Sequence, residues 1–393
     1  MISLKTADNA LKNVYLEVLK NQFDYNIDPF FSKIEKTSND ISGSTVCKIV
    51  SVGVNGGIGA GAETGNLPTA TGNNYVKLTA PLKNLYAQIE ISDKALRASA
   101  NDSGAFVNLL NAEMDNLIES SKFNMRRMLY GDGSSIMGEI LEYTKNNPTY
   151  KVQNVEKYIV GMRVTGTIDA LPHANMQNLD VLDVDYENGT ITVEGRGVVT
   201  ADIQDDEVFE FCLTNNYYPI TGLGTHFASR IGTIFGINKE KNEFMQPNII
   251  NTAKSTFDYI ELLKAIDMTK MDRAGNTDFI VTGFDFRRNV QKMLKNNAIN
   301  CDLQVLEGGF HTLSIEGVPL YANRFISKNV ALLLDSGSFT LHQLCDWTWL
   351  TNDKGEILRQ KEGYAAHNAT LVKYCELVPN RVSANTKIVL SNN

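Results

Sequence analysis

Hydrophobic and polar residues follow different patterns in consecutive segments of the first third of the chain. Residues 44–54 are rich in β-branched side chains, and residues 75–92 place Ala87, Ile89 and Ile91 on one side of an alternating run. This period of two predicts a pair of β-strands. Residues 104–130 instead repeat apolar side chains at helical spacing. That repeat predicts one amphipathic helix about 40 Å long.

The segment between the two predicted strands, residues 55–74, is rich in Gly, Thr and Asn. Fixing a residue's backbone costs about 1–2 kcal/mol, so ordering the whole segment would cost roughly 20–40 kcal/mol. Its few apolar side chains cannot offset that cost within one chain. We therefore predict a hairpin whose tip is either mobile or ordered by a neighbouring subunit. The residues expected to make this contact are Gly56, Gly57, Gly59, Gly61, Glu63, Gly65, Leu67 and Thr71.

The rest of the chain mixes helices and strands without a regular βαβ repeat, which favours an α+β fold. A helix is predicted over residues 11–19, and Asp28 followed by Pro29 is typical of the start of a second, short helix. Several short strands with turn signals between them occupy residues 150–213. This segment is predicted to be a small β-rich module inserted into the parent domain.

Bulk composition narrows the classes of protein only slightly. The 393 residues carry a formal net charge of −8, which argues against a dedicated nucleic-acid binder but leaves room for a local basic face. The five cysteines are scattered and never in CxxC spacing, so reduced thiols are expected. The first residues do not resemble a secretory leader, and no apolar run approaches the ~20 residues that span a bilayer.

Two patterns suggest chemistry, but each departs from the motif that it resembles. The glycines after residues 46–52 resemble a dinucleotide loop, but no helical pattern follows to meet a pyrophosphate. Asp180, Asp183 and Asp185 resemble a calcium run but lack the glycine and distal glutamate of an EF-hand loop. The five histidines have no zinc-site spacing. No GxSxG motif points to a Ser/His/Asp triad, although sequence order alone does not decide that question. We predict no catalytic, cofactor-binding or metal-binding residues, and a protein that is not an enzyme.

Two further groups of residues have both a functional and a structural interpretation. Lys122, Arg126 and Arg127, near the end of the long predicted helix, could face DNA phosphates or form a solvated helix end. Trp347 and Trp349 alternate along a predicted strand, which is more typical of a core or an interface than of a sugar-binding platform.

The order of these parts resembles the tailed-bacteriophage major capsid proteins with the HK97-type fold. Five stretches look like one branch of that family: residues 52–61, 82–95, 104–114, 341–350 and 369–377. The resemblance implies an α+β, HK97-like capsid fold with an N-terminal arm, an extended β-hairpin (the E-loop), a long spine helix, and peripheral and axial domains. The expected division is an arm, 1–43; the E-loop hairpin, 44–92; a peripheral domain, 93–149, with the spine helix 104–130; a β-rich insertion, 150–213; a mainly axial domain, 214–330; and strands returning to the peripheral domain, 331–393.

The resemblance also implies a function and partners. The chain is expected to self-assemble into hexamers and pentamers of an icosahedral shell that encloses double-stranded DNA. The shell would form in the host bacterial cytoplasm and become part of the virion, together with a portal and possible separate scaffolding and decoration proteins, and without a membrane. One alternative is an encapsulin-like protein compartment. Another is a β-rich carbohydrate-binding or hydrolytic phage protein built around residues 150–213.

Overall fold

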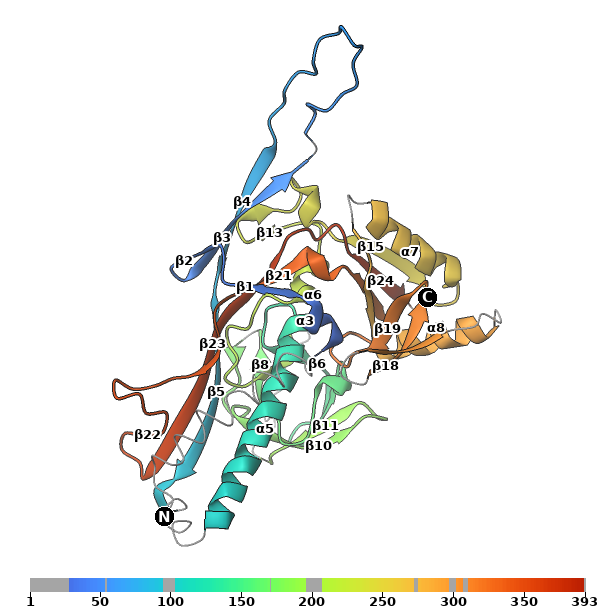
Figure 1. Cartoon of the computed structure of the whole chain (residues 1–393). Helices are drawn as coiled ribbons and strands as arrows, with labels where there is room; N and C mark the ends of the chain where they lie inside the picture. Colours follow the sequence, from blue (N-terminus) through green and yellow to red (C-terminus); the bar gives the residue numbers. More distant parts are fainter. Residues whose placement is uncertain are drawn as a thin grey trace.

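The computed structural model describes residues 28–53, 55–94, 103–169, 171–195, 207–271, 275–296, 302–306 and 310–391. The helix expected over residues 11–19 lies outside these ranges. The described α-helices are α3 (Pro29–Lys33), α5 (Ser103–Tyr130), α6 (Leu223–Ala228), α7 (Tyr259–Met271) and α8 (Phe284–Asn296). Single 3-10 turns occur at Val155–Lys157, Glu243–Met245 and Ser336–Ser338. Figure 1 shows α5 as the long diagonal rod of the molecule.

A five-stranded sheet supports the long helix. Its strands are β1 (Glu35–Thr37), β21 (Phe339–Trp349), β23 (Ala366–Pro379), β22 (Arg359–Gln360) and β5 (Lys83–Ser92), with β23 antiparallel to both β21 and β5. On β5 the predicted alternation is confirmed, because Ala87, Ile89 and Ile91 are buried in one core with Met125 and Met128 of α5. Trp347 and Trp349 lie in the same core, as their plainer interpretation predicted.

The hairpin is built from fewer residues than the sequence pattern indicates. Its strands are β3 (Thr45–Val52) and β4 (Asn74–Pro81), and the two-residue β2 (Ile41–Ser42) pairs with the base of β3. The predicted return strand is divided at Leu82: β4 pairs with β3, while β5 leaves to pair with β23. The part of the chain predicted as one hairpin thus serves two different sheets.

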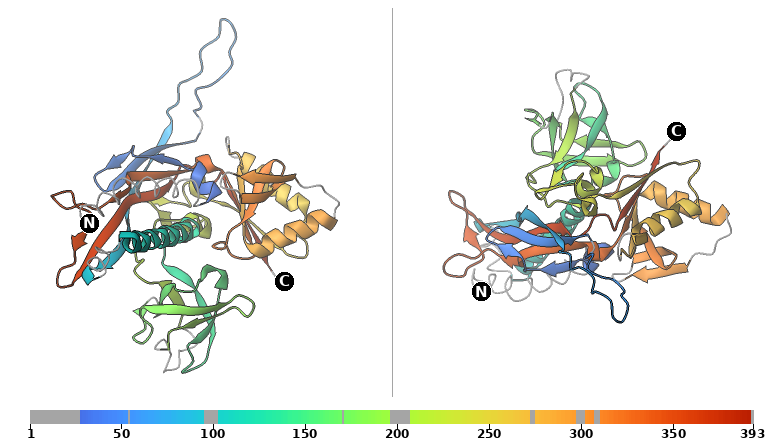
Figure 2. Two further views of the ribbon diagram at one scale, coloured as in Figure 1. Left: turned by 60° about the horizontal axis from the view of Figure 1, so that its bottom comes forward. Right: turned by 90° about the horizontal axis from the view of Figure 1, so that it is seen from above.

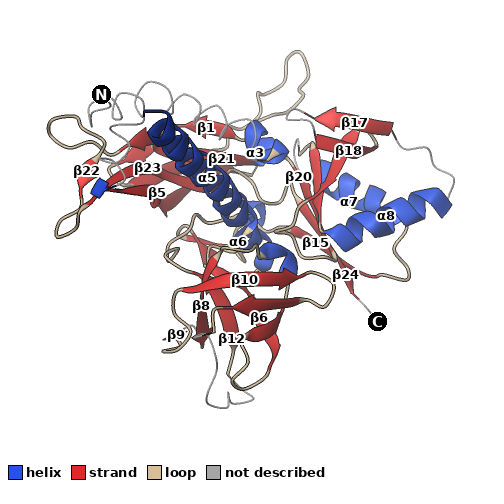
Figure 3. Ribbon diagram, turned by 90° about the horizontal axis from the view of Figure 1, so that it is seen from below, coloured by secondary structure: helices blue, strands red, loops and turns tan. Residues whose placement is uncertain are grey.

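The β-rich insertion is a barrel. Its strands are β6 (Ile136–Tyr143), β7 (Thr149–Val152), β8 (Arg163–Ile168), β9 (Leu171–Pro172), β10 (Leu179–Asp185), β11 (Thr190–Val193) and β12 (Phe209–Leu213). Pairing runs from β6 through β7, β11, β10, β8 and β12 back to β6, so these strands form a ring. Tyr150, Tyr158 and Phe211 fill its centre. β6 belongs to this ring although it precedes residue 150. Figure 3 shows the barrel as a separate body beside α5.

The axial region is a seven-stranded mixed sheet in the order β15 (Asn248–Ala253), β24 (Thr386–Ser391), β20 (Val330–Leu334), β16 (Phe279–Thr282), β19 (Val318–Ala322), β18 (Phe310–Ile315) and β17 (Asp302–Leu306). Helices α7 and α8 share one core with this sheet, which includes Leu262, Phe286 and Leu333. A two-stranded ribbon, β13 (Thr233–Ile234) and β14 (Ile237–Asn238), lies near the hairpin base. Of the final strands, β21 to β23 join the sheet beside α5, whereas β20 and β24 belong to the axial sheet.

The expected fold class is confirmed. The chain is α+β and shows, in order, the hairpin, the long helix, a β-rich insertion and a mixed axial sheet, the parts that the HK97-type resemblance implies. The two views of Figure 2 separate these parts: the hairpin projects from one side, the barrel from another, and the axial helices from a third.

Candidate assembly surfaces

The base of the hairpin is firmly attached to the body of the subunit. Val46, Leu78 and Ala80 are fully buried in a cluster with Met245 and Val378. The Thr79 amide donates a 3.0 Å hydrogen bond to the Phe235 carbonyl in the ribbon between β13 and β14. Because apolar side chains are buried and a backbone amide is hydrogen-bonded at the base, contacts within this chain fix the direction in which the hairpin leaves the body.

The tip of the hairpin, residues 55–73, extends away from the body (Figure 1). The ladder between β3 and β4 ends with the pair Val52 and Asn74. Beyond it, Ile58 is 84% exposed and Leu67 is 91% exposed. All of the residues predicted for the contact with a neighbour are exposed, except the half-exposed Gly57: Gly56, Gly59, Gly61, Glu63, Gly65, Leu67 and Thr71.

A few contacts of its own hold the two limbs of the tip together. Asn55 Oδ1 accepts hydrogen bonds from the Gly57 amide at 2.8 Å and from Thr71 Oγ1 at 3.2 Å. A Cβ atom at Gly56 would lie 3.0 Å from Thr71 Oγ1, so this glycine permits the close approach of the limbs. The tip therefore presents a narrow ribbon with two exposed large apolar side chains, Ile58 and Leu67, and much accessible backbone, which suits contact with a surface of another molecule.

The second candidate surface, the cations near the end of α5, is largely inside the fold. Lys122 is 7% exposed and pairs with Glu119 at 2.9 Å, and Arg127 is 4% exposed. Arg127 Nε donates to Asn124 Oδ1 and Nη1 to the Ser134 carbonyl, and burial lowers the pKa of Arg127 to about 10. In this conformation Lys122 and Arg127 are not open to a phosphate backbone, and Arg126, which is half-buried, is the most accessible of the three.

A buried polar cluster anchors the end of the arm to both the long helix and the axial sheet. Asp28 caps α3 as the sequence predicts, because its Oδ1 accepts from the Phe30 amide at 3.0 Å. The same carboxyl group accepts hydrogen bonds from Tyr130 and Tyr321 hydroxyls at 2.8 and 2.7 Å and from Asn323 Nδ2 at 3.0 Å. Burial raises the pKa of Asp28, and the hydrogen bonds from Tyr321, Tyr130 and the Phe30 amide oppose that shift. Sequence spacing alone gives no sign of a cluster whose members lie some 300 residues apart.

Another set of contacts, missed by the sequence analysis, holds the barrel to the axial domain. Arg324, which follows β19, donates from Nε at 2.5 Å to the Glu156 carbonyl and from Nη2 at 3.0 Å to the Tyr158 carbonyl. Its guanidinium group also lies 5.4 Å from the ring centre of Phe123 on α5. Lys328 pairs with Glu156 at 2.8 Å. Arg324 therefore connects three parts of the fold.

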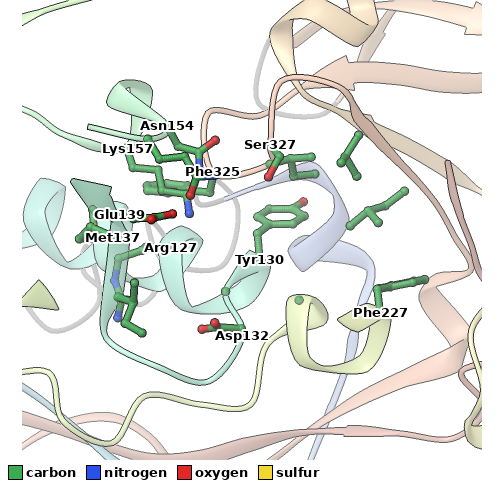
Figure 4. Close-up of a pocket in the computed structure, with 18 of the residues that line it drawn as sticks. Arg127, Tyr130, Asp132, Met137, Glu139, Asn154, Lys157, Phe227, Phe325 and Ser327 are labelled. Carbon is green, nitrogen blue, oxygen red and sulfur yellow. The ribbon is translucent and has the colours of Figure 1, made fainter. Parts of the chain in front are cut away.

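A cavity of about 300 Å³ lies where α5, α6, the barrel and the axial sheet meet. Figure 4 shows Tyr130, Asp132, Glu139 and Lys157 around it. Desolvation lowers the pKa of Lys157, and desolvation together with Glu139 raises the pKa of Glu210, which also lines the cavity. Charged groups of both signs and the ends of several elements converge here, which fits a junction between domains better than a site for one class of ligand.

The sequence patterns that suggested chemistry have structural roles where the structure describes them. The glycine stretch after β3 leads into β4 and not into a helix, so it does not form a dinucleotide-binding turn. Asp180 pairs with Arg163, and Asp185 accepts from the amides of Glu187 and Asn188 within a turn. Among the described residues, no cluster of three His, Cys, Asp or Glu is placed to hold a metal ion. None of the described helices has the length and apolar character that a membrane span needs.

Comparison with known proteins gives similarity at the level of structure. No family model matches the chain, and no curated protein matches it. Three solved structures that align over most of the chain are two capsids and an encapsulin. The capsid of cyanophage A-1(L) is 12% identical and has a TM-score of 0.49, with 92% of this chain and 91% of that chain covered. The SrpI encapsulin of Synechococcus elongatus PCC 7942 is 10% identical, with a TM-score of 0.48 and coverage of 93% and 88%. The capsid of an empty GTA particle is 11% identical, with a TM-score of 0.48 and coverage of 93% and 90%.

Proposed function

We propose that this chain is the shell-forming subunit of an icosahedral phage head, which assembles into hexamers and pentamers around double-stranded DNA. The observation that carries the proposal is the hairpin, whose base is buried in its own subunit and whose tip extends into solvent. A segment with few apolar side chains and an exposed backbone gains order by contact with another molecule, and a second copy of the same chain is the partner that self-assembly supplies.

Assembly on this proposal is geometric and requires no catalytic group. The tip of each hairpin lies across a neighbouring subunit, and the arm that begins before Asp28 reaches another neighbour. One chain then makes several different interfaces, so closure of the shell is cooperative although each contact is modest. Hinges in the hairpin, beyond its buried base, and in the arm would let one sequence occupy both hexamers and pentamers. A portal and separate scaffolding or decoration proteins belong to the same proposal, as does assembly in the host bacterial cytoplasm.

Deletion of residues 56–71 tests the proposal. The remaining residues 53–55 and 72–73 are enough to join β3 to β4, since hairpin loops of this length are common. We expect a monomer with the circular dichroism spectrum and melting temperature of the full chain that forms no shells in negative-stain electron microscopy. Normal shells from the deleted chain would refute the mechanism. Shells from the full chain that contain protein cargo in place of nucleic acid would favour an encapsulin-like compartment.

A further inference from the structure

The exposed face of α8 is basic. Arg288, Lys292 and Lys295 are exposed and occur at positions i, i+4 and i+7, which share one face of a helix. The opposite face, with Phe286, Val290 and Leu294, is buried in the axial core. The three cations span about 10 Å along the helix axis at 1.5 Å per residue. Their position is thus fixed by a well-packed helix and not by a loop.

A groove continues this basic face toward the barrel. It has a volume of about 440 Å³ and lies between α8, the segment after β19 and the barrel. The residues that line it are Glu156, Tyr186, Phe284, Arg288, Arg324 and Lys328. Arg324 and Lys328 are held in place by Glu156 and by the Tyr158 carbonyl, as described above. The groove therefore has fixed cationic walls and is not a chance gap between mobile side chains.

The charge of this region contrasts with that of the whole chain. Helix α8 and the groove together carry six cationic side chains, Arg287, Arg288, Lys292, Lys295, Arg324 and Lys328, against two carboxylates, Asp285 and Glu156. The chain as a whole has a net charge of −8. Helix α7, beside α8 in the same domain (Figure 3), alternates Glu261, Lys264, Asp267 and Lys270. A basic surface of this kind on an acidic protein attracts a polyanion.

We propose that the exposed face of α8 and the adjoining groove, together called the α8 surface, bind the phosphate backbone of the enclosed DNA. The inference rests on the proposed function, which supplies DNA as the partner. Duplex DNA carries one negative charge per ~1.7 Å of helix axis, so several phosphates can come within reach of cations spread over about 10 Å. Contacts of this kind are independent of sequence, as packaging of a whole genome requires. Arg288, Lys292 and Lys295 of the α8 surface are accessible to phosphate groups, whereas Lys122 and Arg127 are buried.

The test uses the full-length chain and a short fluorescently labelled DNA duplex. Binding is measured by fluorescence anisotropy between about 50 and 200 mM salt. The variant Arg288→Gln/Lys292→Gln/Lys295→Gln removes three charges and retains residues that favour a helix. Each lost phosphate contact lowers the slope of log K against log salt by about 0.9, so we expect a decrease approaching 3 and at least tenfold weaker binding at low salt.

The matched control is Lys254→Gln/Lys264→Gln/Lys270→Gln. It changes the net charge by the same amount, within the same domain, at exposed positions outside the α8 surface. If both triple variants bind the duplex as the unaltered chain does, or if both lose affinity equally, the α8 surface is not the DNA contact. If the variant Arg288→Gln/Lys292→Gln/Lys295→Gln forms no shells but binds the duplex normally, the α8 surface is a protein interface and the inference is overturned. Failure of the unaltered chain to form shells would instead count against the proposed function.

Discussion

The hairpin and the barrel both project from the body of the molecule, but they bury their apolar side chains to opposite extents. The barrel buries Tyr150, Tyr158 and Phe211 completely within itself. The hairpin tip instead leaves Ile58 and Leu67 almost fully exposed. The barrel has a hydrophobic core of its own. The tip has no core, so its order depends on what it touches.

This contrast separates two kinds of residue in the same chain. Substitutions inside the barrel should change the stability of the isolated subunit, because the lost contacts are internal. Substitutions at the tip should leave the isolated subunit unchanged and affect only assembly. Residues that connect other parts of the fold, such as Glu376 and Arg324, should have intermediate effects.

The largest loss of stability is expected from Phe211→Ala in the barrel. Phe211 is fully buried, with its ring 5.4 Å from that of Tyr150 and 6.4 Å from that of Tyr158. Truncating such a side chain leaves a cavity and costs about 3–5 kcal/mol. Urea unfolding of the isolated subunit measures this change. The control is Leu182→Ala on the outer surface of β10, which should change the unfolding free energy by less than about 0.5 kcal/mol. Equal effects of the two substitutions would contradict the assignment of a barrel core.

A pH-dependent effect is expected at Glu376, which lies between the barrel exit and the hairpin base. Its Oε1 accepts from the amides of Thr221 at 2.7 Å and Leu377 at 3.0 Å, and burial raises the pKa of Glu376 to about 7. Because the folded-state pKa exceeds the unfolded value, its contribution to stability is complete below about pH 4.5 and is lost as pH rises toward 7.

Glu376→Gln keeps an acceptor for both amides but cannot ionise. Relative to the unaltered chain, this variant should gain up to about 3 kcal/mol between pH 5 and pH 8. Urea titrations at the two pH values provide the comparison. A difference between the two proteins that does not change with pH would show that folding does not raise the pKa of Glu376.

A smaller effect is expected when the barrel is released from the axial domain. Arg324→Gln removes two hydrogen bonds to carbonyl groups and the contact with Phe123, which should cost about 1–2 kcal/mol. Limited proteolysis should also cut the connections to the barrel faster. Lys328→Gln, which breaks a partly exposed ion pair in the same place, should cost less than about 0.5 kcal/mol. If Lys328→Gln is the more damaging change, Arg324 is not the main connection.

The smallest effect on stability is expected at the hairpin tip. Ile58→Ser/Leu67→Ser should change the unfolding free energy by less than about 0.5 kcal/mol, because both side chains are already in water. The yield of shells, counted by electron microscopy, should nevertheless fall severalfold. Ile231→Ser, an exposed apolar residue outside the hairpin, serves as the control and should leave the yield unchanged. Equal loss of shells in both variants would indicate a general loss of surface apolar contacts and not a role of the tip.

Local patterns predicted much of the fold. The alternation at Ala87, Ile89 and Ile91 matches the buried face of β5. The long helix begins at Ser103, one residue before its predicted start. Asp28 caps α3 as expected. In each case the signal is a hydrophobic period or a cap, which depends on neighbours within a few residues.

What the sequence did not show depends on contacts between distant residues. The division of the return strand at Leu82 is set by β23, whose residues lie nearly 300 positions later. Burial of Lys122 and Arg127 follows from packing of α5 against other parts of the fold, which a helical period cannot reveal. The barrel includes β6 because its partner β12 closes the ring from the far end of the insertion. The roles of the hairpin residues in contacts with a neighbour stay a prediction.

Closure of the barrel has a consequence for contacts between copies of the chain. An open sheet offers unpaired amide and carbonyl groups along its outermost strand, and such a row can recruit strands from other molecules. In the ring of β6, β7, β11, β10, β8 and β12 each strand pairs with two others, and the two-residue β9 pairs with β8 outside the ring. The six strands of the ring therefore present no unpaired edge to another copy of the chain.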